Sequence, residues 1–374
     1  YCLESSYSYS HHKLCLSYFF DHFFILYHIM TPKLISLFTG IGGFDSGFGG
    51  VVEVPREAVD DAFINLESQV DGFVILRKHD YETVFQNDIL NVDKILEWNN
   101  MKCSNFNKRS IYDLIRDEDF EFPDCDVIIG GFPCQPFSNA GKRLGFNSDK
   151  SHDLKSPANS ENNVGNLYKC FVEVVRRKRP KIFVAENVRG LLSIEGAIET
   201  ICNDFANLGY KVQYQLVDCC EYGIAQTRQR VIIMGIRNDH TGNLPENWNV
   251  LTKNRRGCKL KHYFNHLENP EVSVDISQQL FSKAKKLVKG QGQSIVDLEG
   301  PGPTMRAEHH GNIEFRNDKR RLTVREAGLI QTFSPTFKFT EKSMSSPYKY
   351  IGNAVPPLLS YLIADKVACL LDFF

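Results

Sequence analysis

The sequence predicts an α/β protein with a doubly wound, mostly parallel sheet and a second, smaller domain of irregular structure. Short apolar runs alternate with segments of helical periodicity, which is typical of a parallel sheet covered by helices. Each run ends in glycines or polar residues, and in such sheets ligands bind at that edge. The alternation stops after residue 236 and resumes near the carboxyl end, so a separate unit is expected in between.

Four apolar runs are the expected strands. They cover residues 33–38, 83–86, 126–129 and 181–185. The first run ends in Thr-Gly-Ile-Gly-Gly, and the others end in Asn-Asp, Gly-Gly and Glu-Asn. A buried strand closed by glycine or by polar residues is followed by a tight turn. We therefore expect the polar ends of these strands to lie together.

Helical periodicity marks the connecting segments. It is clear in residues 167–177, after Thr323, and in the apolar stretch 358–371, which is expected to rejoin the first domain. In residues 55–70 the apolar side chains also recur at helical spacing. An inserted helix at the edge of the sheet is therefore expected there.

Four parts make up the expected chain: an extension at 1–30, a first domain at 31–236, a second domain at 237–320, and a return segment at 321–374 that completes the first domain. The extension is rich in Tyr, Phe, Ser and His, and charged or imidazole side chains interrupt its apolar run. It predicts neither a membrane span nor a signal peptide. Met30 leads directly into the first strand, so residues 1–30 are expected to be non-native or disordered; a genuine amino-terminal arm is the alternative.

Charge is unevenly distributed along the chain. The 374 residues include 44 Lys and Arg against 45 Asp and Glu, so a uniformly basic coat is excluded. Residues 237–325, however, contain 16 Lys and Arg against 10 Asp and Glu. This excess predicts a polyanionic partner for the second domain, and a solvated basic face is the alternative. Eleven cysteines without a CxxC pair indicate a reduced, cytoplasmic protein, and no metal or membrane partner is expected.

The first strand ends in a glycine-rich turn. The third glycine of a dinucleotide fingerprint is replaced by Asp45, so a pyrophosphate site is not expected. A GxGG turn suits an adenosyl ligand without pyrophosphate, because only close approach of the backbone is needed. Asp88, after the second strand, is placed to accept hydrogen bonds from ribose hydroxyls. A purely structural turn is the alternative.

Three further segments carry candidate chemistry. Cys134 follows Gly-Phe-Pro after the third strand, and the prolines on both sides of it restrict a loop that exposes a potential nucleophile. Glu186 follows the fourth strand and is expected to project toward the same cleft, although it could be a helix cap. Arg228 and Arg230 lie on one face if their segment is extended, as phosphate or carbonyl recognition requires; a surface ion-pair strand is the alternative.

These segments together resemble the DNA (cytosine-5) methyltransferases. Six motifs in order carry the resemblance: FTGIGGFDSGF at 38–48, GGFPCQPFS at 130–138, AENVRGLL at 185–192, QTRQR at 226–230, RRLTVREAGLIQTF at 320–333 and YIGNAVPP at 350–357. They span nearly the whole chain from residue 33 to residue 367. The resemblance implies the Rossmann-like fold of the S-adenosylmethionine-dependent methyltransferases, with a target-recognition domain for DNA in the basic region.

The resemblance also assigns roles to residues. Cofactor contacts are expected from Phe38, Thr39, Gly40, Ile41, Gly42, Gly43, Asp88, Ile89, Ser110, Ile111, Pro133, Leu167, Asn353 and Val355. Ser110 stands where the family usually has aspartate. DNA contacts are expected from Gln135, Ser138, Arg306, His309, His310 and Asn312.

The implied reaction methylates C5 of a flipped-out cytosine in a specific duplex and releases S-adenosylhomocysteine. Cys134 would add to C6, Glu186 would assist at N3, and Arg228 and Arg230 would orient the base and hold a flanking phosphate. A monomeric, cytoplasmic modification enzyme paired with a restriction endonuclease is expected. The alternatives are a transfer RNA cytosine-5 methyltransferase and a non-catalytic DNA-binding relative.

Overall fold

The structure is a computed structural model. It describes residues 31–70, 72–133, 167–240, 248–253, 258–283, 296–307, 320–340 and 347–374, with the backbone alone at 65–70. The predicted extension at residues 1–30 therefore lies outside the described residues.

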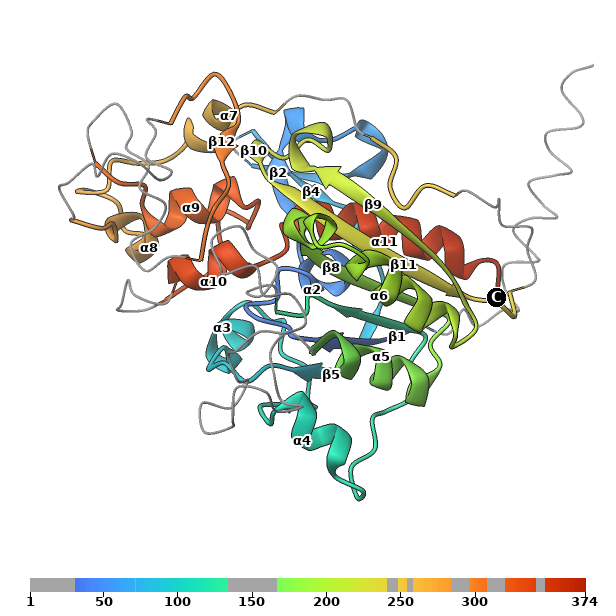
Figure 1. Ribbon diagram of the computed structural model, residues 1–374. Coiled ribbons are helices and arrows are strands. Elements are labelled where there is room, and N and C mark those ends of the chain that lie inside the picture. Colours follow the sequence, from blue (N-terminus) through green and yellow to red (C-terminus); the bar gives the residue numbers. More distant parts are fainter. Residues whose placement is uncertain are drawn as a thin grey trace, which may run out of the picture.

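A seven-stranded sheet forms the centre of the described chain (Figure 1). Its strands, in spatial order, are β6 (Phe106–Asn107), β5 (Glu82–Asn87), β1 (Lys33–Leu37), β7 (Val127–Gly130), β8 (Ile182–Val188), β11 (Gln229–Arg237) and β9 (Tyr210–Asp218). All pairs from β6 to β8 are parallel, whereas β11 is antiparallel to both of its neighbours. The predicted mostly parallel sheet is confirmed.

The order of the strands defines where a ligand can bind. β1 lies between β5 and β7, so the chain proceeds to one side of β1 first and to the other side afterwards. At such a switch point the connections leave in opposite directions and open a crevice beyond the carboxyl ends of the strands. The glycine turn after β1, Asp88 after β5 and Gly131 after β7 all lie at these ends.

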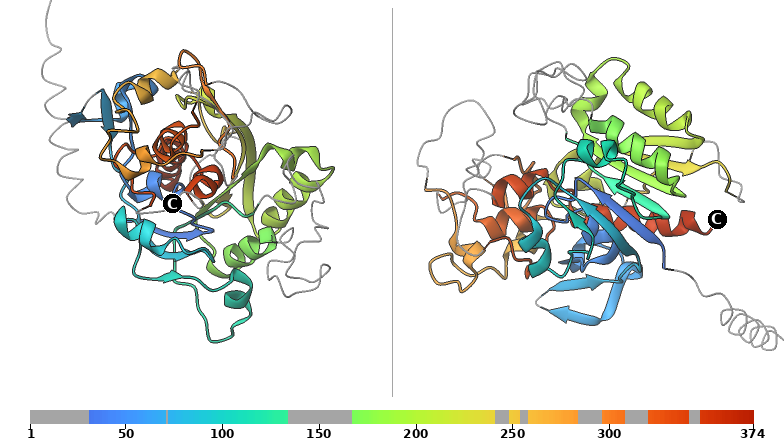
Figure 2. Two further views of the ribbon diagram at one scale, coloured as in Figure 1. Left: turned by 90° about the vertical axis from the view of Figure 1, so that its left-hand side faces the viewer. Right: turned by 90° about the horizontal axis from the view of Figure 1, so that it is seen from below.

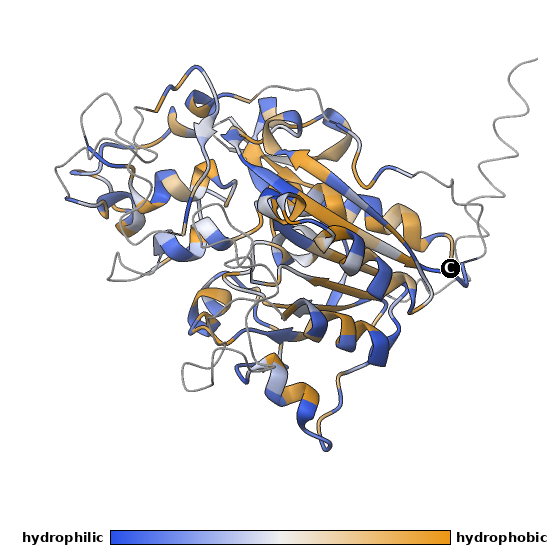
Figure 3. Cartoon of the chain, viewed as in Figure 1, coloured by the Kyte–Doolittle hydropathy of each residue, from blue (hydrophilic) through white to orange (hydrophobic). Residues whose placement is uncertain are grey.

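Helices cover both faces of the sheet over two separate cores. Alternate residues of each strand enter different cores, as Leu34 and Ile35 of β1 show. One core contains α4 (Ile111–Arg116), α5 (Leu167–Lys178) and α6 (Ala197–Ala206). The other contains α2 (Asp45–Gly49), α3 (Asp93–Trp98) and α11 (Pro357–Leu371). Figure 3 shows the central strands and α11 as predominantly hydrophobic.

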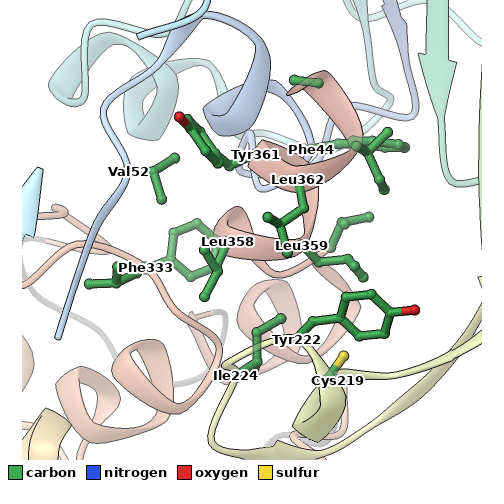
Figure 4. Packing of buried hydrophobic residues seen from close by; sticks show 14 of the residues in the cluster. Phe44, Val52, Cys219, Tyr222, Ile224, Phe333, Leu358, Leu359, Tyr361 and Leu362 are labelled. Carbon is green, nitrogen blue, oxygen red and sulfur yellow. The ribbon is translucent and has the colours of Figure 1, made fainter. Parts of the chain in front are cut away.

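The carboxyl-terminal helix α11 completes the core beneath the glycine turn. It packs so closely on α2 that a Cβ on Gly47 would lie 2.2 Å from the carbonyl carbon of Ser360. Figure 4 shows Leu358 of this helix beside Phe333. Among the described residues, Pro347–Leu371 is the one stretch apolar and long enough to cross a bilayer, but 61% of its most apolar part is buried, as in a core helix.

The expected helix at residues 55–70 is wrong. That region forms a three-stranded antiparallel sheet from β2 (Glu53–Pro55), β4 (Phe73–Leu76) and β3 (Ile64–Val70), with two 3₁₀ turns, η1 (Arg56–Ala58) and η2 (Asp61–Phe63). An Asp-Gly turn and β-branched residues outweigh the helical spacing, and Gly72 has the positive φ of 82° that such a turn needs. In Figure 2 this small sheet lies at the periphery of the molecule.

The basic region and the first part of the return segment, before α11, consist of short elements at one end of the sheet (Figure 1). They are α7 (Leu260–Phe264), α8 (Ile276–Gln279), β12 (Gly302–Pro303), α9 (Val324–Ile330) and α10 (Pro347–Asn353). β12 pairs in parallel with β10 (Gln226–Thr227), which immediately precedes β11. Two more 3₁₀ turns, η5 (Arg189–Ser193) and η6 (Cys219–Glu221), follow β8 and β9. The predicted irregular architecture of this region is confirmed for its described residues.

Candidate active site

The glycine turn after β1 has the backbone geometry of a ligand cradle. Phe38, Gly40 and Gly42 have positive φ angles of 56°, 55° and 80°. The Thr39 N–H donates to the carbonyl oxygen of Asn87 at 3.1 Å, which ties the turn to the end of β5. No heavy atom lies within 4 Å of a Cβ built on Gly40. Glycine is therefore favoured at this position by its dihedral angles, and the turn is open on that side.

Gly42 and Gly43 are enclosed rather than open. A Cβ on Gly42 would lie 2.5 Å from Met101 Cε, and one on Gly43 would lie 2.4 Å from the carbonyl oxygen of Val355. Val355 and the glycine turn, which are distant in sequence, are thus in direct contact. The structure brings these predicted cofactor residues together, with Asn353 exposed two positions before Val355.

Asp88 orders the turn. Its Oδ2 accepts a hydrogen bond from the Gly40 N–H at 2.7 Å, and its Oδ1 accepts one from the Leu90 N–H at 2.8 Å. Burial raises the pKa of this carboxyl, while the two backbone donors oppose the rise. Each oxygen retains acceptor capacity for a hydroxyl. The neighbouring Ile89 exposes 49% of its surface, although it is a large apolar residue.

The predicted cofactor contacts Ser110 and Ile111 lie at the start of α4. Ser110 caps this helix, with its Oγ accepting the Tyr112 N–H at 3.3 Å. Ile111 and Leu167 are almost fully buried, so both belong to the core beneath this corner. Sequence reasoning missed Asn87, whose Nδ2 donates to the carbonyl oxygens of Asn107 and Arg109 at 2.8 and 2.9 Å. Asn87 thereby holds the loop before α4 against the end of β5.

A buried carboxyl lies directly beneath the glycine turn. Asp45 accepts hydrogen bonds from Ser36 Oγ at 3.0 Å and from Gln86 Nε2 at 2.8 Å. Thr39 Oγ1 in turn donates to Ser36 Oγ at 3.0 Å. Burial raises the pKa of Asp45 from 3.8 to about 6. The only signal in the sequence was an acidic residue where the dinucleotide fingerprint has its third glycine.

Glu186 and Arg230 form a nearly buried ion pair at the carboxyl end of the sheet. Arg230 Nε lies 2.7 Å from Glu186 Oε1, with the side chains 11% and 9% exposed. Glu186 is part of β8, opposite Ile232 of β11, so the strand continues past the run that the sequence predicted. A Cβ on Gly131 would lie 3.2 Å from Glu186 Oε2. The carboxylate thus faces the backbone that leads to the predicted nucleophile.

Asn187 holds the loop that enters the nucleophile motif. It is 1% exposed, and its Nδ2 donates to the carbonyl oxygen of Phe132 at 3.4 Å. Pro133, a predicted cofactor contact, is the last residue described before the gap. The predicted residues Cys134, Gln135 and Ser138 lie outside the described residues, as do His309, His310 and Asn312.

Arg228 and Arg230, the predicted pair, contact different groups in the structure. Arg228 is 1% exposed, and its guanidinium donates to the carbonyl oxygens of Met305, Gly352 and Ala354 at 3.0–3.1 Å. These carbonyls lie 77–126 positions away in sequence, which is why sequence reasoning did not find them. Arg228 therefore holds these main-chain segments together, and Arg230 forms the ion pair with Glu186.

On the recognition side, Arg306 is exposed on the segment after β12. Its backbone packs against the return segment, because a Cβ on Gly352 would lie 2.2 Å from the Arg306 carbonyl carbon. Within the ranges described above, no three His, Cys, Asp or Glu side chains gather in a way that could hold a metal ion.

A Rossmann-like sheet with a glycine turn at its switch point, and with the Glu186–Arg230 ion pair two strands away, is the arrangement of a methyltransferase fold. The chain belongs to the C-5 cytosine-specific DNA methylase family, whose model matches residues 32–369. Its enzyme class, DNA (cytosine-5) methyltransferase of the type found in type II restriction-modification systems, agrees with the class predicted from the motifs.

Two curated relatives illustrate the match. The type II methyltransferase M.BsuRI of Bacillus subtilis is 31% identical over 90% of this chain and 79% of its own length. M.NgoFVII of Neisseria gonorrhoeae is 30% identical over 87% of this chain and 83% of its own length.

Solved structures share the fold at lower identity. A DNMT2 mutant of Spodoptera frugiperda is 16% identical to this chain with a TM-score of 0.58. The match covers 91% of this chain and 100% of the DNMT2 chain. The Entamoeba histolytica methyltransferase EhMeth has a TM-score of 0.55 and 15% identity, and covers 91% of this chain and 99% of its own. At this identity the likeness establishes the fold alone.

Proposed function

We propose that the protein transfers a methyl group from S-adenosylmethionine to C5 of a cytosine flipped out of a specific duplex DNA sequence. The observation that carries the proposal is the Glu186–Arg230 pair, which lies behind the Gly131–Phe132 backbone. In the sequence, Pro133 and then Cys134 follow this segment. A charged pair of this kind suits a polar heterocycle that must be held and polarised.

The open glycine turn fits an adenosyl group. Gly40 leaves space for close approach, Asp88 offers acceptors to ribose hydroxyls, and exposed Ile89 offers an apolar surface to a purine. The remaining cofactor contacts named in the sequence analysis are part of this proposal. When bound, S-adenosylmethionine supplies an electrophilic sulfonium methyl group and leaves as S-adenosylhomocysteine.

We assign the nucleophile to Cys134. C5 of cytosine is too weak a nucleophile to react directly, so a thiolate must first add to C6. The new S–C6 bond pushes electron density to C5 while N3 gains a proton or a hydrogen bond from Glu186. C5 then takes the methyl group, and water accepts the C5 proton. Departure of the thiolate from C6 and return of the N3 proton to Glu186 restore the aromatic ring. Arg230, held by Glu186, orients the base.

The other cysteines that the structure describes are poor candidates for the nucleophile, which favours Cys134. Burial raises the pKa of the eight described thiols, those of Cys103, Cys125, Cys170, Cys202, Cys219, Cys220, Cys258 and Cys369. A thiol with a raised pKa forms little thiolate at neutral pH and is a poor nucleophile. None of these thiols is part of the six motifs.

The basic region is proposed as the target-recognition domain, between a catalytic part at 31–236 and a return segment at 321–374. Exposed Arg306 contacts DNA there, together with His309, His310 and Asn312, while Gln135 and Ser138 contact the space vacated by the base. The relatives' names, type II methyltransferases, support a modification role. Pairing with a cognate restriction endonuclease and a monomeric, cytoplasmic enzyme remain part of the proposal.

The test is covalent trapping on duplex DNA. The chain is expressed in cells, and bisulfite sequencing of their DNA identifies the methylated site. A duplex with 5-fluorocytosine at that site should then become linked to the enzyme in the presence of S-adenosylmethionine, because fluorine blocks the final elimination. Cys134→Ala should abolish the linkage, whereas Cys369→Ala should retain it.

Three results would reject the proposal in different ways. Linkage by Cys134→Ala would remove the assigned nucleophile. Transfer of labelled methyl to transfer RNA but not to duplex DNA would establish the RNA enzyme instead. Duplex binding by the wild-type chain without any transfer would favour a non-catalytic DNA-binding protein.

A further inference from the structure

Arg228 is the largest of the fully buried side chains in the described structure. Its Nη1 donates to the Met305 carbonyl at 3.0 Å, and its Nη2 donates to those of Gly352 and Ala354 at 3.1 Å each. Met305 belongs to the segment after β12, whereas Gly352 and Ala354 belong to the return segment. One guanidinium therefore fastens two chain segments to each other and to the start of β11.

Two glutamines reinforce the same junction. The Met305 N–H donates to Gln226 Oε1 at 2.9 Å, and Gln226 Nε2 donates to Gln331 Oε1 at 2.8 Å. Gln331 Nε2 in turn donates to the Ala354 carbonyl that Arg228 also binds. Gln226 and Gln331 are both fully buried. The junction is thus a connected polar network, in which displacement of one member leaves another without its partner.

The two ends of the network reach two different ligand sites. On one side, Met305 precedes exposed Arg306, whose backbone packs on Gly352. On the other side, Ala354 precedes Val355, whose carbonyl oxygen touches the position of a Cβ on Gly43 in the glycine turn. A shift of the recognition segment is therefore passed to the turn through residues 352–355.

We infer that Arg228 is a positioning residue that couples DNA binding to cofactor binding. This inference rests on the proposed function, which places DNA at the recognition segment and the cofactor at the glycine turn. A planar guanidinium suits the task because its rigid fork presents several donors at once, whereas an ammonium cannot reproduce that geometry. The same burial argues against contact with the target base, since the fork is turned toward main-chain oxygens.

The experiment measures binding, with no turnover required. The dissociation constant of S-adenosylhomocysteine is determined by calorimetry with and without a duplex that carries the site found by bisulfite sequencing. The reciprocal constant for the duplex is determined with and without S-adenosylhomocysteine. Coupled sites must change each other's affinity by the same factor, commonly about 5- to 150-fold. We expect a factor in this range for the wild-type protein.

Arg228→Lys should reduce the factor to near unity while each ligand still binds alone. Gln331→Met is the second variant, because it removes one bond to Ala354 but leaves Gln226 bonded to the Ile330 carbonyl. It should lower the factor partially even if Arg228→Lys does not fold. The matched control is Arg176→Lys, an exposed arginine paired with Glu173 on α5, which should leave the factor unchanged.

A duplex with an abasic target position separates positioning from base contact. If Arg228 acts through the backbone, Arg228→Lys weakens binding of this duplex as much as that of the intact one. A penalty that disappears on the abasic duplex would overturn the inference, as would an unchanged factor in both variants or a wild-type factor near unity. Wild-type protein that binds neither ligand alone would refute the proposed function, and the inference with it.

Discussion

Gly43→Ala tests whether the carboxyl-terminal motif supports the cofactor turn. The added Cβ would lie 2.4 Å from the Val355 carbonyl oxygen and 2.9 Å from Ala354 Cβ. Non-bonded heavy atoms prefer a separation of about 3.5 Å, so the turn and the motif must part by about 1 Å. Gly43 does not have a positive φ, so this contact alone causes the strain.

The expected cost is that of overpacking, about 1–3 kcal/mol in the free energy of unfolding. Displacement of the turn should also weaken a hydrogen bond to the cofactor, which corresponds to about a 2- to 10-fold loss of affinity. Urea titration measures the first effect, and calorimetry with S-adenosylhomocysteine measures the second.

The matched control is Gly49→Ala at the end of α2, the short helix that follows the turn. There the nearest atom to the added Cβ, the carbonyl oxygen of Tyr81, is 3.4 Å away, which is ordinary contact. This variant should be neutral or slightly more stable, because alanine loses less backbone entropy than glycine. The reasoning is refuted if the two variants behave alike, or if Gly43→Ala binds cofactor as the wild-type protein does.

Three further predictions concern pH, catalysis and DNA. The pKa of Asp45 is about 6 in the folded protein, against the ordinary value of 3.8. Its contribution to the free energy of unfolding is therefore complete below about pH 4 and is lost as the pH rises through about 6. Asp45→Asn should remove up to about 3 kcal/mol of this pH dependence, measured by comparing unfolding of the two proteins across pH. Glu186→Gln should lower kcat by about 10²–10⁴ with little change in duplex affinity, and an unchanged kcat would exclude its role at N3. Arg306→Gln should reduce the slope of log K against log salt by about 0.9, whereas an unchanged slope would show that no phosphate is bound there.

The main sheet could be predicted because its signals are local. The strands β1, β5, β7 and β8 each contain one of the predicted apolar runs, and each is followed by residues suited to a turn. Alternation of strand and helix then determines parallel pairing. The helix predicted for residues 55–70 was wrong because a periodicity carried by three apolar residues is weak evidence. The Asp71-Gly72 pair in the sequence was the stronger signal, and it favours a hairpin.

The site was predictable only in part, for a physical reason. Asp88, Gly131 and Glu186 could be placed from strand ends, because parallel strands bring their carboxyl ends to one edge. The role of Arg228 could not be predicted, because its three carbonyl partners belong to segments whose path depends on tertiary packing. The bond between Asp45 and Gln86 joins residues 41 positions apart and has no local signature either.

The bond between Ser360 Oγ and the Phe44 carbonyl joins positions that are 316 residues apart. During translation, the apolar side of the segment after β1 stays without its partner helix α11 until nearly the whole chain has been made. Chains that lack α11 should therefore lack enzymatic activity and depend on chaperones. For the same reason, fragments that separate β1 from α11 should regain structure only as a complementary pair.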